Sequence, residues 1–387
     1  MATYKEQNKL NVPHLRFPEF QGEWEKHGLS EYLDFKNGLN PDSKRFGKGI
    51  KFISVMDILN NPVITYDCIR ASVQATDAEI SSFSVENGDI LFQRSSETLE
   101  DVGRANVYID DRVAVFGGFV IRGKKKANYN PLFFRYLLSS PYARKRIIPM
   151  GAGAQHFNIG QEGLSKVLLN FPSIEEQTKI ASLLHLLDER IATQSKLIEK
   201  LESLIKGISS RIFASIQGIE YRMGDIVTIT NGNSNVQDAV TQSKDGLYPF
   251  FDRSEDIKYL PTFLFDKEAI YISGEGTEFM PRYFKGKFAL HQRCYAIFDF
   301  NEIINARFLY FYLKTRNSYF VKNAVGSTVP SLRLDTFQKL KVIIPPKKIQ
   351  YSVSLCLSFM EQKCNIEKKI LHKLLKQKQY LLRQMFI

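Results

Sequence analysis

Lysine, arginine and small polar side chains gather in short, loop-like segments of this chain, next to stretches that resemble β-strands. Such groups bind anions: lysine and arginine neutralise phosphates, and arginine can donate two hydrogen bonds to one guanine edge. In the first half they are Lys44, Arg45, Lys48, Lys51, Arg94, Ser95, Ser96, Arg104, Gln155 and His156. In the second half they are Arg253, Thr277, Arg282, Lys285, Lys287, Gln292, Arg293 and Thr328. We predict that most of them face one anionic partner. For each residue alone, the alternative is a solvated charge or a turn.

The charge balance supports an anionic partner. The 387 residues include 53 Lys and Arg against 41 Asp and Glu, a formal net charge of +12. A basic surface of this kind is typical of nucleic-acid binding. Basic proteins that bind no nucleic acid remain the alternative.

Residue patterns for metal or phosphate-loop chemistry are missing from the sequence. It has no Gly-Lys-Ser/Thr loop and no His/Cys/Asp cluster with metal-ligand spacing. Its four cysteines (Cys68, Cys294, Cys356 and Cys364) lie far apart or on a helix, as free thiols in a reducing compartment do. We therefore expect a binding protein that holds no metal and no cofactor of its own.

An internal repeat organises the chain. Residues 153–213 and 326–386 align without a gap at a constant offset, which Pro172 and Pro345 illustrate (345 − 172 = 173). Each copy has a hydrophobic strand that stops at proline, followed by a long helical pattern. The loop-rich regions 37–101 and 231–286 have little in common. A shared scaffold with different loops indicates one physical task performed on two different targets.

The helical part of each copy has the a/d heptad spacing of a coiled coil. The positions of the first copy are Ile180, Leu184, Leu187, Ile191, Gln194, Ile198, Leu201, Ile205, Ile208 and Ile212. Those of the second copy are Val353, Leu357, Met360, Cys364, Glu367, Leu371, Leu374, Lys378, Leu381 and Met385. The polar Glu367 occupies the position of Gln194.

These patterns predict an α+β fold in which two mixed α/β globular domains are separated by a long antiparallel two-helix coiled coil, with a pseudo-two-fold internal repeat. The helices pair antiparallel because the chain makes the second domain before it returns. At about 1.5 Å per residue the heptads span roughly 50 Å, so the rod would act as a ruler. The alternative is that each helix packs on its own domain.

Within the domains, β-rich runs predict strands and amphipathic runs predict helices. In the first domain the expected strands are 50–56, 89–93, 105–109 and 113–121, with a helix at 131–146. In the second they are 226–230, 269–273 and 288–298, with a helix at 305–323.

The corresponding boundaries are 1–172 for the first domain (with an N-terminal arm at 1–24), 173–216 for the central helix, 217–345 for the second domain and 346–387 for the last helix. No run of eighteen apolar residues and no signal-peptide core occurs. We therefore expect a soluble cytoplasmic protein without membrane contact.

The order of these parts resembles a known family. A globular domain, a Pro172-Ser173-Ile174-Glu175-Glu176-Gln177 helix start and a long heptad helix, all repeated once, are similar to the specificity (S) subunit of type I restriction–modification enzymes. Further similar segments are Glu86–Arg94, Ile272–Gly276 and Val12–Phe20. The second copy departs from the pattern because Lys347-Lys348-Ile349-Gln350 lacks acidic residues in its first helical turn.

The resemblance implies two target-recognition domains, each reading one half of an interrupted site in double-stranded DNA. It also implies that the coiled coil sets the gap and docks two methyltransferase (M) subunits, which two motor–nuclease (R) subunits can join. S-adenosylmethionine, ATP and Mg²⁺ then belong to the partner subunits.

The chain itself is predicted to be non-catalytic. An adenine aminomethyltransferase needs an Asp/Asn-Pro-Pro-Phe/Tyr loop, and the only Pro-Pro pair, Pro345-Pro346, precedes Lys347. Two other classes stay open: a nuclease or methyltransferase with divergent motifs, and a coiled-coil scaffold without DNA specificity.

Overall fold

The computed structural model describes residues 11–387, so the beginning of the expected N-terminal arm lies outside the described residues. The chain divides into two compact units. One comprises the chain up to Ser195 together with Ile370–Ile387, and the other comprises Lys196–Lys369. Each unit contains one globular domain and one segment of each of two long helices. Among residues 11–387, no helix has both the length and the apolar character needed to cross a membrane.

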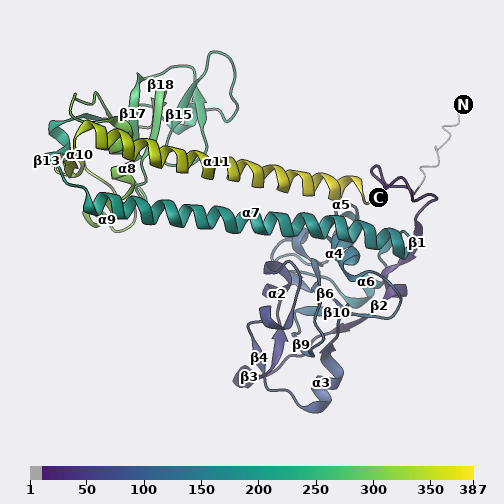
Figure 1. The fold of residues 1–387 in the computed structure, drawn as a ribbon. Coiled ribbons are helices and arrows are strands. Elements are labelled where there is room, and N and C mark those ends of the chain that lie inside the picture. Colours follow the sequence, from purple (N-terminus) through teal and green to yellow (C-terminus); the bar gives the residue numbers. More distant parts are fainter. Residues whose placement is uncertain (1–10) are drawn as a thin grey trace, which may run out of the picture. The chain divides into compact units, whose positions relative to one another are not determined.

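The two long helices are α7 (Ile174–Ser215) and α11 (Lys347–Gln384). In each unit a segment of α7 lies beside a segment of α11 and runs in the opposite direction (Figure 1). Ion pairs link the segments within each unit: Lys378 with Asp188 at 2.5 Å in the first, and Lys368 with Glu202 at 2.5 Å in the second. The predicted α+β fold with long helices is therefore confirmed.

Most heptad positions are buried or half-buried, but the buried face of α7 shifts near its end. Ile208 is 37% exposed, whereas Ser209 and Phe213 are buried. A straight α-helix drifts by about 20° per heptad relative to a 3.5-residue repeat. Over the heptads from Ile180, this drift is enough to move the contact from Ile208 to its neighbour.

The first domain is built on two four-stranded sheets, with strand orders β2-β10-β6-β8 and β4-β3-β9-β5, and two strand pairs, β1-β12 and β7-β11. Its strands are β1 (Glu25–Gly28), β2 (Leu33–Asn37), β3 (Phe46–Ile53), β4 (Ser72–Val73), β5 (Ser84–Val85), β6 (Ile90–Gln93), β7 (Ser95–Ser96), β8 (Ala105–Val107), β9 (Ala114–Phe116), β10 (Val120–Lys125), β11 (Phe157–Asn158) and β12 (Leu168–Phe171). Its helices are α1 (Leu29–Tyr32), α2 (Val55–Asn60), α3 (Asp77–Phe83), α4 (Pro131–Ser139), α5 (Pro141–Ile147) and α6 (Gln161–Ser165).

The second domain has one six-stranded sheet of order β14-β19-β17-β18-β15-β16 and the pair β13-β20. Its strands are β13 (Ile219–Arg222), β14 (Thr228–Asn231), β15 (Tyr248–Phe251), β16 (Lys258–Leu260), β17 (Phe265–Ser273), β18 (Arg282–Leu290), β19 (Cys294–Phe298) and β20 (Lys341–Ile344). Its helices are α8 (Ala306–Lys314), α9 (Asn317–Asn323) and α10 (Leu334–Gln338).

Five predicted elements differ from the structure. The predicted strand 50–56 ends at Ile53, and Val55 and Met56 begin helix α2. The predicted strand 113–121 is two strands in different sheets, interrupted at Gly117-Gly118, and the predicted strand 288–298 covers parts of both strands of the β18–β19 hairpin. The predicted helix 131–146 is broken at Pro141, whose ring and missing N–H end α4. The predicted helix 305–323 is α8 and α9, separated at Thr315-Arg316.

The core of the first unit combines distant parts of the chain. Trp24 packs edge-to-face against Phe133 at 6.1 Å and Phe386 at 6.4 Å between ring centroids. Leu381 of α11 and Met385, which follows that helix, belong to the same buried cluster. The arm residue Leu15 donates its backbone N–H to Gln384 O at 2.9 Å. Residues 370–387 are therefore part of this core.

A glutamine fixes each domain to its long helix in the same way. Gln177 Nε2 donates to Pro172 O at 3.0 Å, and Gln177 Oε1 accepts from Asn130 N at 3.1 Å. Gln350, 173 residues later, makes the matching bonds to Pro345 O at 2.9 Å and Asn305 N at 2.8 Å. Asn130 and Asn305 also cap α4 and α8. The repeated glutamine is thus a structural joint.

A matched carboxylate forms a second joint. Asp188 Oδ2 accepts from Tyr136 OH at 3.0 Å and pairs with Arg135 at 3.3 Å. Its counterpart Glu361 (361 − 188 = 173) accepts from Tyr310 OH and Lys314 Nζ, both at 2.7 Å. The polar Lys378 within the heptad positions is explained by its ion pair with Asp188.

Candidate nucleic-acid interface

The candidate residues of the first domain fall into two groups on different sheets. Lys44, Arg45, Lys48 and Lys51 lie on or just before β3, whereas Arg94, Ser95 and Ser96 lie at the end of β6 and on β7. β7 pairs with β11, which follows the exposed loop holding Gln155 and His156. The structure therefore brings these last two segments together.

Several predicted contact residues of the first domain have internal partners. Arg45 forms a two-bond ion pair with Glu79, and the pair lowers the pKa of Glu79 to about 2. Lys51 Nζ donates to Ile69 O at 2.6 Å, and Arg94 Nη1 donates to Gly118 O at 3.2 Å. These three side chains support the scaffold. The exposed Lys44 and Lys48 are better placed for a partner.

Arg104 faces a cavity of about 480 Å³ beside α2 and α4. It is half exposed and pairs with Asp101 at 2.5 Å. On the same wall, burial and the neighbouring Arg104 lower the pKa of Arg144 to about 10. Arg144 Nη2 is bonded to Glu100 O and Val102 O, so this guanidinium holds the adjacent turn.

In the second domain, the structure places Arg253, Gln292 and Arg293 around one cavity of about 540 Å³. Arg253 and Arg282 also line an adjoining cavity of about 190 Å³. Their proximity could not be predicted from the sequence, because Arg253 follows β15 whereas Gln292 and Arg293 form the β18–β19 turn.

The same cavity contains groups that the sequence analysis missed. Burial opposes ionisation of Asp252, but hydrogen bonds from Lys258 and Ser254 outweigh it and lower the pKa of Asp252. Burial lowers the pKa of His291 and raises that of Cys294 to about 12, so neither is charged at neutral pH. A protonated thiol is a poor nucleophile, and the polar lining is suited to binding. An Asp-Arg-Ser turn directly after a strand was the available sequence signal for Asp252.

The remaining candidates of the second domain lie on an exposed hairpin and two adjacent loops. Lys285 and Lys287 of β18 stand opposite Glu268 and Asp266 of β17. Thr277 and Thr328 are exposed, and their loops meet where Gly276 N donates to Pro330 O at 3.0 Å.

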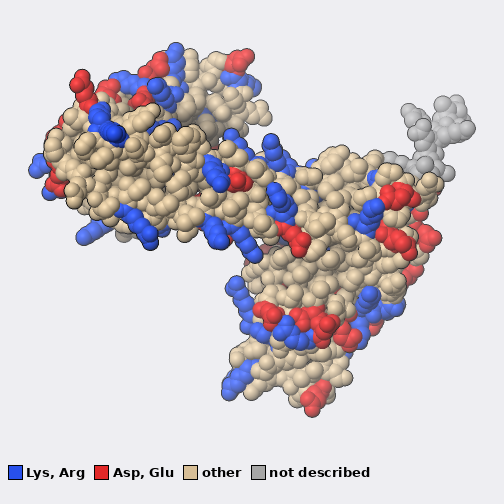
Figure 2. Space-filling model, viewed as in Figure 1, with Lys and Arg blue, Asp and Glu red and all other residues tan. Residues whose placement is uncertain are grey.

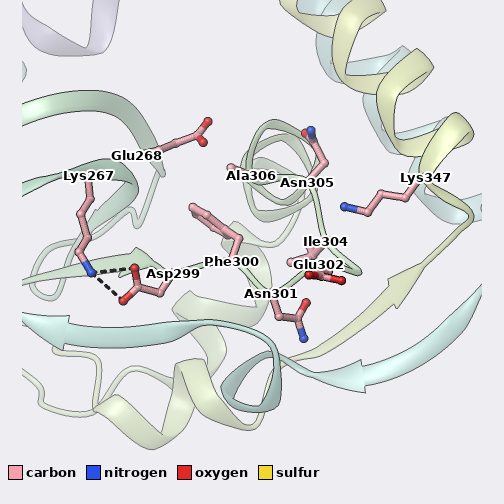
Figure 3. Close-up of a pocket in the computed structure, with 10 residues that line it drawn as sticks. All are labelled: Lys267, Glu268, Asp299, Phe300, Asn301, Glu302, Ile304, Asn305, Ala306 and Lys347. Carbon is pink, nitrogen blue, oxygen red and sulfur yellow. Dashed lines mark hydrogen bonds and ion pairs between the residues drawn. The ribbon is translucent and has the colours of Figure 1, made fainter.

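A further cavity, of about 500 Å³, lies where the second domain joins α11 (Figure 3). Lys267 Nζ donates to both carboxylate oxygens of Asp299 at 2.7 Å. The lining also includes Glu268, Glu302 and Lys347. Such mixed charge gives no net attraction for phosphate, so this cavity lies outside the candidate interface.

The visible faces of the long helices carry basic side chains among residues of other kinds (Figure 2). Exposed apolar residues also occur on both helices, and two of them occupy equivalent positions in the repeat: Leu186 of α7 is 63% exposed and Phe359 of α11 is 62% exposed (359 − 186 = 173). Both lie outside the heptad positions from which the contact face was predicted. The sequence signal that could have identified Leu186 and Phe359 is an apolar residue at the same place in both copies of the repeat, outside the heptad positions.

Across residues 11–387, no group of three or more His, Cys, Asp or Glu side chains is arranged to hold a metal ion. The described site therefore offers hydrogen-bond donors, acceptors and positive charge.

Comparisons with known proteins agree with this picture. The profile of the type I restriction modification DNA specificity domain matches residues 21–203 and again residues 219–376. The chain therefore belongs to this family and carries the domain twice.

Two curated relatives are similar to parts of the chain. The type I restriction enzyme EcoDI specificity subunit of Escherichia coli is 30% identical over 123 residues, 32% of this chain and 26% of the relative. The putative type I restriction enzyme MjaX specificity subunit of Methanocaldococcus jannaschii is 25% identical over 215 residues, 54% of this chain and 49% of the relative. The matches thus span about a quarter and about half of these relatives.

One solved structure shares the fold over nearly the whole length. The type I restriction–modification S subunit from M. genitalium superimposes with a TM-score of 0.66 at 18% identity, covering 97% of this chain and 99% of that chain. At this identity the likeness shows the fold.

Proposed function

We propose that the chain is the non-catalytic DNA-recognition subunit of a type I restriction–modification complex. Each domain reads one half of an interrupted DNA site, and the paired long helices set the gap. The observation that carries this proposal is the double match to the specificity-domain family in a chain whose two domains use the same joints but different loops.

The basic surface supplies the affinity in this proposal, and the loops supply the specificity. Lysine and arginine contacts to phosphates position a protein on the duplex, whereas side chains at base edges read its sequence. The exposed Lys44 and Lys48 suit the first role, and the cavity around Arg253 and Gln292 suits the second. A coiled-coil scaffold that does not bind DNA would lack a salt-sensitive affinity for duplex DNA.

The partners that we propose are two copies of an adenine methyltransferase subunit, which two motor–nuclease subunits can join. S-adenosylmethionine, ATP and Mg²⁺ would act on those subunits, in the cytoplasm. The positions of Leu186 and Phe359 favour two copies of the methyltransferase subunit, because an equivalent exposed apolar residue in each repeat offers the same partner surface twice.

Mapping methylated adenines tests the recognition role. DNA from cells that express this chain with its cognate methyltransferase should show one motif with two specified halves and an unspecified gap. A continuous motif, or no motif that depends on this chain, would contradict the proposal. The purified chain alone should neither methylate nor cut DNA.

Native mass spectrometry tests the docking role. Leu186→Asp and Phe359→Asp should each bind one methyltransferase copy instead of two, and the double variant should bind none. The control is Leu204→Asp, because Leu204 is 54% exposed but its counterpart is the polar Gln377. Full assembly of the double variant would refute these docking positions.

A further inference from the structure

The turn after β15 presents an arginine without an internal partner. Arg253 is exposed, and no other residue in the range 11–387 forms a hydrogen bond or an ion pair with its guanidinium. It lines both adjoining cavities of the second domain, of about 540 and 190 Å³, together with Asp252 and Ser273. Its side chain is therefore available to a partner that enters either one.

The backbone beneath Arg253 is fixed by its neighbours. The 7% exposed Asp252 accepts from Ser254 N at 2.7 Å, Ser254 Oγ at 2.6 Å and Lys258 Nζ at 2.6 Å. Arg282 Nη1 donates to Ser254 O at 2.5 Å. Both residues adjacent to Arg253 are thus held in place. A side chain on a rigid support loses less freedom on binding.

The other basic groups of the larger cavity are already engaged. Arg293 pairs with Glu275 at 2.5 Å, and Lys258 pairs with Asp252. Burial keeps His291 neutral by lowering its pKa. Arg253 is accordingly the cation that the described lining leaves unpaired.

The acidic residues of the lining decide which DNA group suits Arg253. Asp252 and Glu275 line the larger cavity, and Glu255 and Glu278 line the smaller one. In the smaller cavity the carboxylates Asp252, Glu255 and Glu278 outnumber the two arginines, so a phosphate is disfavoured there, whereas a base edge carries no net charge. The planar guanidinium fits the two acceptors of guanine, O6 and N7, and a nearby carboxylate can accept from the amino group of cytosine.

We propose that Arg253 reads a guanine in the half-site of the second domain, with Asp252 as the residue that positions it. The proposal rests on the recognition function proposed above and specifies the base that this domain contacts.

Motif mapping with the complete complex tests the proposal. Wild-type protein should show a guanine in the half-site that persists when Leu29–Phe171 is exchanged for the same region of a relative. Arg253→Ala and Arg253→Lys should both lose about tenfold or more of the preference for guanine at one position. Lysine keeps the charge but lacks the two-pronged donor. Asp252→Asn should relax the same position by a smaller factor and leave the other half-site unchanged.

The control is Arg222→Ala, an exposed arginine on β13 away from both cavities, which should leave the motif unchanged. The proposal is overturned if Arg253→Ala keeps the full guanine preference. It is also overturned if Arg253→Ala lowers methylation equally at all sequences and Arg253→Lys restores that methylation, because this is the behaviour of a phosphate contact. A wild-type two-part motif without guanine in this half overturns only this proposal. Absence of any two-part motif in the wild type overturns the recognition function as well.

Discussion

Gln350 Oε1 accepts the backbone N–H of Asn305 at 2.8 Å, which ties the first turn of α11 to the N-terminus of α8. Its Nε2 donates to Ile303 O at 2.8 Å and Pro345 O at 2.9 Å, so a fully buried amide satisfies three backbone groups. Backbone groups of this kind are costly to leave unpaired in a protein interior.

Replacing Gln350 with alanine should therefore lower the free energy of unfolding of the second unit by about 3 kcal/mol. Urea unfolding of the variant measures this change. Gln362→Ala is the matched control, since Gln362 is exposed on the same helix and in the same unit and should change stability by less than about 0.5 kcal/mol. Equal stability of the two variants would show that the glutamine joint is dispensable.

Asp188 gathers three partners from two elements: Arg135, Tyr136 and Lys378. Asp188→Asn keeps a hydrogen-bond acceptor but leaves two part-buried cations without a counter-charge. We expect a loss of about 3 kcal/mol of stability in the first unit. In a double-mutant cycle with Lys378→Met, the double variant should lose about 1 kcal/mol less stability than the sum of the losses in the two single variants. Strict additivity would mean that the ion pair contributes nothing.

The Arg45–Glu79 pair predicts a pH-dependent stability. The pKa of Glu79 is lowered from 4.5 to about 2 in the folded protein. Its stabilising contribution is thus complete above about pH 4.5 and disappears as the pH falls toward 2. Arg45→Ala should be less stable than the wild type at pH 7, and the difference should shrink through that window. A difference that stays constant with pH would rule out this origin.

Arg45→Ala also separates support from DNA contact. If Arg45 supports the scaffold, the variant should change stability but keep the salt dependence of DNA binding, whereas Lys44→Ala and Lys48→Ala should each reduce the salt slope by about 1. Titrations of duplex DNA at several salt concentrations distinguish the two roles.

Exchange of a whole domain should alter half of the target. Replacing Leu29–Phe171 with the same region of a relative keeps α7 and the Pro172 and Gln177 side of the glutamine joint, so only one half of the methylated motif should change. A change in both halves, or in neither, would mean that the domains do not read DNA independently.

The spacing role that we propose for the long helices predicts the effect of an insertion. Four residues placed between Ser203 and Leu204 of α7 add about 6 Å, close to two base pairs, and about one helical turn. The motif should keep both halves and gain one or two unspecified bases. As a control, four residues inserted between Asp245 and Gly246, in an exposed loop, should leave the gap unchanged. An unchanged gap in an active α7 variant would contradict the ruler.

Features with a regular spacing could be predicted from the sequence. The constant offset of 173 residues and the heptad positions give the duplication and both long helices, because helical periodicity is a local property. The break at Pro141 could also have been predicted, since proline ends a helix. The β18–β19 turn could not be predicted, because His291-Gln292-Arg293 contains none of the usual turn residues.

The candidate site was less predictable because it depends on partners distant in the sequence. In the sequence, Arg45 and Arg253 look alike, since both are arginines in loop-like segments. Only the fold shows that Arg45 forms an ion pair with Glu79 and that Arg253 has no partner among the described residues. Charge composition identifies the class of ligand, whereas tertiary contacts decide which side chains remain available for it.

The division of the chain into units affects its synthesis. The second unit uses one continuous stretch of 174 residues (369 − 195 = 174), whereas the first needs Ile370–Ile387 to cover Trp24 and Phe133. Ribosomes add about 5–20 residues per second. The first domain therefore emerges early but waits roughly 10–35 s for the segment that closes its core. During that interval the second unit can complete its fold, and the apolar surface of the first domain that is still uncovered is a natural substrate for a chaperone.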